Sequence, residues 1–194
     1  MKLYSMRQII LIVLIPIVLS AQGRDNWQKP EVIMDSVGIK PGMIIGEIGA
    51  GDGYFTFKMV DRIGPKGHIY ANDIVKSKLD YINRKCKEDN INTITTILGE
   101  ENDSLLPKDT LDLVIMVYTF HHLEKPVEYL ENLRKIIKKN TPVVIVERDP
   151  ERYGHEYYHF FKKEKVINLI KEADYQLKKL YTFLKRDNIY VIIP

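Results

Sequence analysis

The sequence has little cysteine and almost no excess of charge of either sign. Its one cysteine, Cys86, cannot form an internal disulfide and has no C-x-x-C partner, which excludes disulfide frameworks, cysteine zinc sites and thioredoxin-type redox chemistry. The 29 basic and 26 acidic residues leave too small a surplus to indicate a nucleic-acid-binding protein. Repeats and low-complexity stretches are also missing. With 194 residues, 45% of them hydrophobic, we expect one globular domain.

The N-terminus carries a short basic segment followed by an apolar run at residues 9–19 and then by Ser20 and Ala21. This layout predicts a secretory signal peptide at residues 1–21, cut after Ser20 or Ala21. Eleven helical residues reach about half of a ~30 Å hydrocarbon core, which is too short for a stable membrane span. We therefore expect export to the periplasm or the medium. The alternatives are a membrane tether through an uncleaved leader, a cytoplasmic protein, or a buried first helix.

The rest of the chain alternates between short apolar runs and amphipathic stretches, which predicts alternating strands and helices. Residues 22–42 are expected to form a linker and a short helix, and residues 43–194 the main domain. The predicted strands are 43–48, 69–73, 93–98, 111–118, 143–147, 177–184 and 189–193, with helices at 54–63, 75–86, 127–138 and 166–173. The last two strands are joined by only four residues, so the final strand must be antiparallel. The expected fold is α/β, with about seven strands and helices on both faces.

A glycine-rich turn follows the first predicted strand, where residues 47–53 read E-I-G-A-G-D-G. Glycines let the chain turn sharply and let a ligand lie against backbone, and the helix that follows offers free N–H groups. The dinucleotide fingerprint needs a glycine at position 54, which is Tyr54 here, so an NAD-type oxidoreductase is disfavoured. Asp73 ends the second strand, where a carboxylate can accept both hydroxyls of a ribose. Together these features predict a site for a nucleoside-type cofactor.

This combination resembles the class I S-adenosylmethionine-dependent methyltransferases, from about residue 27 to the C-terminus. The turn resembles the first motif of that Rossmann-like family, Asp73 its ribose-binding acid, and the last hairpin its reversed final strand. The similarity is closest to small signal-bearing bacterial members. It implies S-adenosyl-L-methionine as the cofactor. The residues implied to bind its methionine portion are Glu47, Gly49, Gly51 and Gly53. Asp73 would bind the ribose, Ile74 would lie beside the adenine, and Glu100 would reach the adenine amine. Asp103 is the substitute for Glu100 at the adenine amine.

Methyl transfer from a sulfonium requires alignment of the acceptor and removal of its proton, and in principle it requires no metal. The base must lie at the carboxyl ends of the fourth and fifth strands, where ligands bind in such sheets. The candidate bases at this edge are Tyr118, His121, His122, Glu147 and Asp149, and the predicted catalytic residues are the first three. Histidine has the most suitable ordinary pKa, about 6.5. The alternative is that the two histidines only cap backbone or pack over the cofactor.

The segment after the fifth strand is rich in histidine and aromatic residues. His155 and His159 are four residues apart, so a metal-assisted acceptor site with the earlier histidine pair is an alternative to a metal-free one. The aromatic side chains predict a lid over the acceptor, or else a half-buried connecting helix. They are Tyr153, Tyr157, Tyr158, Phe160 and Phe161.

The expected function is methyl transfer to a small-molecule acceptor. A nucleic-acid acceptor is not expected, because the Asn/Asp-Pro-Pro-Tyr motif of base methyltransferases is replaced by Y-T-F-H at residues 118–121. The alternatives are a non-catalytic nucleoside-binding module on the same fold and a protein carboxyl methyltransferase. An exported enzyme also conflicts with a cofactor made in the cytoplasm, unless it acts in transit, keeps its leader or binds another nucleoside. No sequence feature indicates an oligomeric state.

Overall fold

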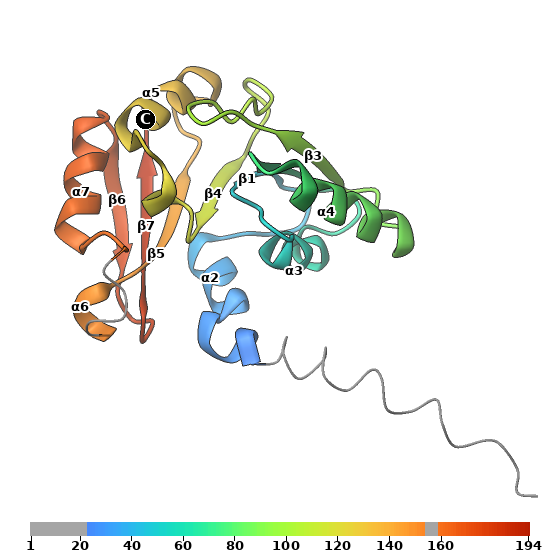
Figure 1. Cartoon of the computed structure of the whole chain (residues 1–194), viewed down its shortest axis with the longest axis horizontal. Coiled ribbons are helices and arrows are strands. Elements are labelled where there is room, and N and C mark those ends of the chain that lie inside the picture. The colour runs from blue at the N-terminus through green and yellow to red at the C-terminus, as the bar shows by residue number, and fades with distance from the viewer. Residues whose placement is uncertain (1–22, 154–158) are drawn as a thin grey trace, which may run out of the picture.

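The computed structural model describes residues 23–153 and 159–194, so the predicted leader, Gly154, His155, Tyr157 and Tyr158 lie outside the described residues. One sheet has the strand order β3-β2-β1-β4-β5-β7-β6 (Figure 1). Its strands are β1 (Ile44–Ile48), β2 (His68–Asp73), β3 (Ile94–Leu98), β4 (Leu113–Val117), β5 (Val143–Arg148), β6 (Gln176–Tyr181) and β7 (Asp187–Ile193). Strands β1 to β5 pair in parallel, whereas β7 is antiparallel to both β5 and β6. The predicted α/β sheet with a reversed last strand is confirmed.

Helices cover both faces of this sheet, and Figure 1 shows α4 beside β3 at one end and α7 beside β6 at the other. The helices are α2 (Pro30–Val37), α3 (Tyr54–Ile63), α4 (Lys76–Glu88), α5 (Pro126–Ile136), α6 (Pro150–Tyr153) and α7 (Lys163–Glu172), with a 3₁₀ turn η1 (Phe120–His122). Among the described residues, no helix is both long enough and apolar enough to cross a membrane.

The core has two halves because successive residues of a strand point to opposite faces. In β4, Leu113 and Ile115 pack with buried residues of α2, α3 and α4, whereas Val114 and Met116 pack with those of α5 and α7. All four side chains are fully buried. The sheet is therefore covered on both faces. The ends of the strands are the part of the sheet that a ligand can reach.

The N-terminal part differs from the expected linker. Residues 23–28 are helical and lie against the domain ahead of α2. Asp25 accepts a hydrogen bond from the Tyr54 hydroxyl and lies 2.7 Å from the Lys58 ammonium, both on α3. The Trp27 ring stacks on Tyr118, with 6.1 Å between ring centroids. Polar and aromatic contacts hold this segment in place. Because its sequence has no apolar stripe, the hydrophobic pattern does not predict this helix.

Candidate functional site

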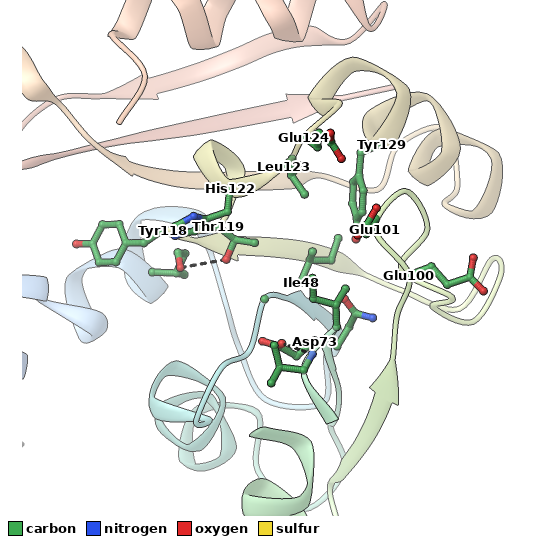
Figure 2. Close-up of a pocket in the computed structure, with 15 residues that line it drawn as sticks. Ile48, Asp73, Glu100, Glu101, Tyr118, Thr119, His122, Leu123, Glu124 and Tyr129 are labelled. Atoms are coloured by element: carbon green, nitrogen blue, oxygen red, sulfur yellow. Dashed lines mark hydrogen bonds between the residues drawn. The ribbon is translucent and has the colours of Figure 1, made fainter. Parts of the chain in front are cut away.

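A cavity of about 460 Å³ opens at the carboxyl ends of β1, β2 and β4 (Figure 2). Its volume lies within the range of small-molecule sites. It is lined by Ile48, Gly49, Asn72, Asp73, Ile74, Val75, Glu100, Glu101, Val117, Tyr118, Thr119, His122, Leu123, Glu124 and Tyr129. The structure therefore brings together six of the sequence-predicted cofactor and catalytic positions around one space: 49, 73, 74, 100, 118 and 122. Tyr118 reaches the same space from the end of β4.

Asp73 is held in one orientation by the backbone. Its Oδ2 accepts a hydrogen bond from the Gly51 N–H at 2.8 Å, and its Oδ1 accepts one from the Val75 N–H at 2.9 Å. Each carboxylate oxygen can accept more than one hydrogen bond, so both retain capacity for a diol. Ile74 is 58% exposed beside it and offers an apolar surface to a flat ring. This geometry fits the ribose and adenine contacts that the sequence predicts.

The three glycines of the turn have different surroundings. A Cβ on Gly49 would collide with the Thr119 side chain, so this glycine allows β1 and the end of β4 to approach closely. Gly51 has a φ of +58° and borders open space, which leaves room for a ligand against its backbone. Gly53 directly precedes α3, and a Cβ at this position would collide with Phe57 and Ile82. Of the three, only Gly49 lines the cavity directly.

Glu47 lies beneath the turn and not at the cavity wall. It is buried and accepts a hydrogen bond from the Thr56 hydroxyl on α3. Burial raises the pKa of Glu47 to about 8, with the Asp73 charge acting in the same direction. The side chain is therefore mostly protonated near neutral pH. Its predicted contact with the methionine portion of a cofactor stays a prediction.

The loop after β3 contributes two adjacent acids to the cavity, Glu100 and Glu101. Figure 2 shows the Glu100 side chain projecting away from Asp73 and Ile48. Asp103 is not a lining residue, and its Oδ1 accepts a hydrogen bond from the Leu105 N–H at 2.9 Å. The predicted contact of Glu100 with an adenine amine stays a prediction, and the structure adds Glu101 as a second carboxylate for it.

Sequence reasoning missed several lining residues. Asn72 is buried and donates through Nδ2 to the Ser104 carbonyl at 2.7 Å, which ties the end of β2 to the loop after β3. Thr119 and Leu123 come from the segment between β4 and α5, and Tyr129 comes from α5 itself. Asn72 could have been found from its position next to Asp73. The other three could not, because they reach the cavity only through the path of the chain after β4.

Tyr118 is at the end of β4, with an unusual backbone φ of +56°. Its hydroxyl donates to Asp187 Oδ2 on β7 at 2.8 Å, and Figure 2 shows its ring extending away from Thr119 and His122. Burial and the Asp187 carboxylate raise the pKa of Tyr118 above its ordinary value. The phenol therefore stays protonated near neutral pH and is not available to accept a proton from a ligand.

The two histidines of η1 have separate environments. The His121 side chain is only 3% exposed, and its Nδ1 lies 3.0 Å and 2.9 Å from the two carboxylate oxygens of Glu147. His122 is exposed to the cavity, with its ring centroid 3.9 Å from that of His121. Partial burial and the neighbouring His121 lower the pKa of His122, so its ring is neutral at neutral pH. His122 can therefore accept a proton from a ligand in the cavity.

The predicted aromatic lid is described only in part. Phe160 is buried with its ring centroid 4.1 Å from that of His121, and Phe161 packs against Phe120 at 6.3 Å. The His159 ring is 5.5 Å from His121. In residues 23–153 and 159–194, no group of three or more His, Cys, Asp or Glu side chains is arranged to hold a metal ion. The metal-assisted alternative also involves His155, which lies outside the described residues, so this alternative stays a prediction.

The strand order, the glycine turn and a carboxylate at the end of the adjacent strand define a Rossmann-like, nucleoside-binding class of protein. A family model described as a methyltransferase domain matches residues 39–188. The chain belongs to this family, and its fold is that of the class I S-adenosylmethionine-dependent methyltransferases. The family that the sequence resembles is confirmed.

Three known proteins show the range of the similarity. Demethylmenaquinone methyltransferase of Geobacillus sp. (strain WCH70) is 23% identical over 148 residues, 75% of this chain and 62% of that protein. A SAM-dependent methyltransferase from Aquifex aeolicus superposes with a TM-score of 0.82 at 23% identity, covering 92% of this chain and 96% of that one. Geranyl diphosphate C-methyltransferase from Streptomyces coelicolor A3(2) gives 0.71 at 10% identity, covering 91% and 83%. The chain spans about three fifths of the length of the curated relative.

Proposed function

We propose that this chain transfers a methyl group from S-adenosyl-L-methionine to a small-molecule acceptor. The observation that carries the proposal is one continuous cavity with a fixed carboxylate, Asp73, in its wall and a neutral imidazole, His122, lining it as well. The first group suits the ribose of the methyl donor. The second suits removal of a proton from the acceptor.

The residues present fit the methyl donor. Asp73 would accept the ribose hydroxyls, Ile74 would lie against the adenine, and the open space above Gly51 would hold the methionine portion. When bound, S-adenosylmethionine supplies a methyl group already activated on a sulfonium. The protein then has to hold the acceptor in line with that methyl and accept its proton at a ring nitrogen of His122.

A small acceptor is supported by the form of the site and by the charge of the chain. The cavity is about 460 Å³ and includes the apolar side chains of Leu123 and Tyr129, which suit a compact organic ligand. The chain has a formal net charge of only +3, too little for a strong attraction to nucleic acid. The similarity to a demethylmenaquinone methyltransferase is consistent with such an acceptor. The rival acceptor is a protein carboxyl group.

The test is to follow a labelled methyl group. The protein is incubated with methyl-labelled S-adenosylmethionine and a cell extract separated into small molecules, protein and nucleic acid. The proposal predicts label in the small-molecule fraction with wild-type protein, and a large loss with His122→Ala. Label in the protein fraction would favour carboxyl methylation, and label in nucleic acid would overturn the choice of acceptor. Label in no fraction, with detectable cofactor binding, would favour a non-catalytic module.

A further inference from the structure

The helical segment 23–28 carries three side chains on one face that contact one another or residues next to the site. Residues 24, 27 and 28 are separated by three and four positions, so they share one face of a helix. The Arg24 guanidinium lies 3.7 Å from the centroid of the Tyr54 ring, and Trp27 stacks on Tyr118. Tyr54 directly follows the glycine turn at the end of β1, and Tyr118 directly follows β4, the parallel neighbour of β1. The segment therefore lies next to residues that follow the glycine turn and β4.

Gln28 is a buried amide with an unused donor. It is 0% exposed, and its Oε1 accepts a hydrogen bond from Arg24 Nε at 2.8 Å. Its Nε2 has no acceptor among the residues that the structure describes. A buried donor without an acceptor costs about 1 to 3 kcal/mol, so such groups usually mark the position of a ligand or of ordered water. A ligand that satisfies this group must be a hydrogen-bond acceptor.

Arg24 adds a positive charge at the same place. Its guanidinium has no ion-pair partner in the described part of the chain, although it is half-buried against Tyr54. Its charge reaches the glycine turn, since it opposes the rise in the pKa of Glu47. A guanidinium beside an unused amide donor is a pairing suited to a carboxylate.

We propose that Arg24 and Gln28 bind the α-carboxylate of the methionine portion of S-adenosylmethionine. The inference rests on the proposed function, because Asp73 must first fix the ribose. With the ribose there, the amino-acid end of the cofactor extends over Gly51, where the turn borders open space. Arg24 lies against Tyr54, three residues after Gly51, and Gln28 accepts a hydrogen bond from Arg24. The segment thus selects ligands that have an amino-acid end.

The segment is anchored independently of these two side chains, so their replacement need not displace it. Asp25 accepts the Tyr54 hydroxyl and pairs with Lys58 at 2.7 Å. Trp27 lies against Tyr118 and also beneath the Arg148 guanidinium, 5.0 Å from its ring centroid. An Arg24→Ala variant should therefore keep the fold and the position of the helix.

The experiment compares two ligands by isothermal titration of the full chain. S-adenosylhomocysteine has the carboxylate, whereas 5′-methylthioadenosine retains the adenosine and the sulfur but lacks the amino-acid end. Arg24→Ala and Gln28→Leu should each weaken S-adenosylhomocysteine binding about ten- to a hundred-fold and change 5′-methylthioadenosine binding by less than about two-fold. Arg84→Ala is the matched control, because Arg84 lies over an aromatic ring on α4, at 5.2 Å from Tyr81.

Each outcome supports or overturns the inference. A selective loss for S-adenosylhomocysteine, partly restored in Arg24→Lys, supports it. Equal losses for both ligands would mean that the segment acts only on the shape of the site, and no loss would mean that the carboxylate binds elsewhere. Either result overturns the inference and leaves the proposed function standing. If wild-type protein binds neither ligand, the proposed function itself fails, and the inference with it.

Discussion

His121 is anchored to Glu147 across the sheet edge: the carboxylate accepts from the backbone N–H of His121 at 3.2 Å and lies within 3.0 Å of its ring Nδ1. Both side chains are almost completely buried. One acid thus fixes both the start of η1 and the His121 ring. Because the His122 ring contacts that ring in a tilted arrangement, with 3.9 Å between centroids, this pair sets the position of the one histidine of η1 that lines the cavity.

Glu147→Gln should lower turnover with little effect on cofactor binding. The amide removes the charge that holds His121, so His122 loses its fixed position. We expect a turnover about ten- to a hundred-fold lower, with S-adenosylhomocysteine affinity within about two-fold. Steady-state kinetics and calorimetry give the two values. Glu151→Gln, at a partly exposed acid on α6, is the control. A parallel fall in affinity and thermal midpoint would assign Glu147 to structure alone.

His122→Ala should reduce turnover about 10²- to 10⁴-fold, the usual cost of losing a general base. Wild-type activity should also depend on pH in a defined direction. The pKa of His122 is lowered from the ordinary histidine value of about 6.5, so the ring stays neutral at pH 6.5 and above. The rate should therefore fall only at more acidic pH. The rate profile of the wild type between pH 5 and 8 measures this. A rate that falls already above pH 7 would contradict it.

Glu47→Gln should stabilise the protein at high pH and not at low pH. The folded-state pKa of about 8 exceeds the unfolded value of about 4.3, so the wild type loses stability as pH rises between them. Each unit of that shift corresponds to about 1.36 kcal/mol, or about 3 to 5 °C in Tm for a domain of this size. In thermal unfolding, the Tm of Glu47→Gln minus that of the wild type should be several degrees larger at pH 9 than at pH 5. An equal difference at both pH values would exclude a raised pKa.

The predicted leader gives a mature chain of defined mass. Cleavage after Ser20 or Ala21 would leave residues 23–28 in place, so the mature protein should bind S-adenosylhomocysteine as tightly as the full chain. Intact-mass analysis of protein from the native cell envelope should find an N-terminus at Ala21 or Gln22. A full-length cytoplasmic protein as the main form would contradict the leader prediction.

Local patterns were sufficient to predict the sheet and half of the site. Strands such as β5 are short apolar runs, and a four-residue connection requires the reversed β7, so both follow from short-range rules. The glycine turn and Asp73 could be predicted because each directly follows a strand. The segment 23–28 could not, because Arg24 and Asp25 hold it through polar contacts to α3 and no apolar period marks it.

The pairing of the catalytic candidates also needed the structure. His121 and Glu147 are 26 residues apart, and each was a candidate base on its own. Only the parallel register of β4 and β5, with Val117 beside Val146, brings the two following segments together. Likewise, the link between Tyr118 and Asp187 spans 69 residues and depends on β7 pairing with β5. The register of strands that are distant in sequence thus places His121 against Glu147, His122 at the cavity and the Tyr118 hydroxyl against Asp187.

The most direct test of the account is the ligand preference of the cofactor site. Calorimetric titration of the full chain with S-adenosylhomocysteine, NAD and ATP should show clear binding of the first and much weaker binding of the others. Asp73→Ala should weaken S-adenosylhomocysteine binding about ten- to a hundred-fold, because the ribose loses a charged acceptor. Detectable binding of NAD in preference to S-adenosylhomocysteine, or binding that is unchanged in Asp73→Ala, would contradict the account.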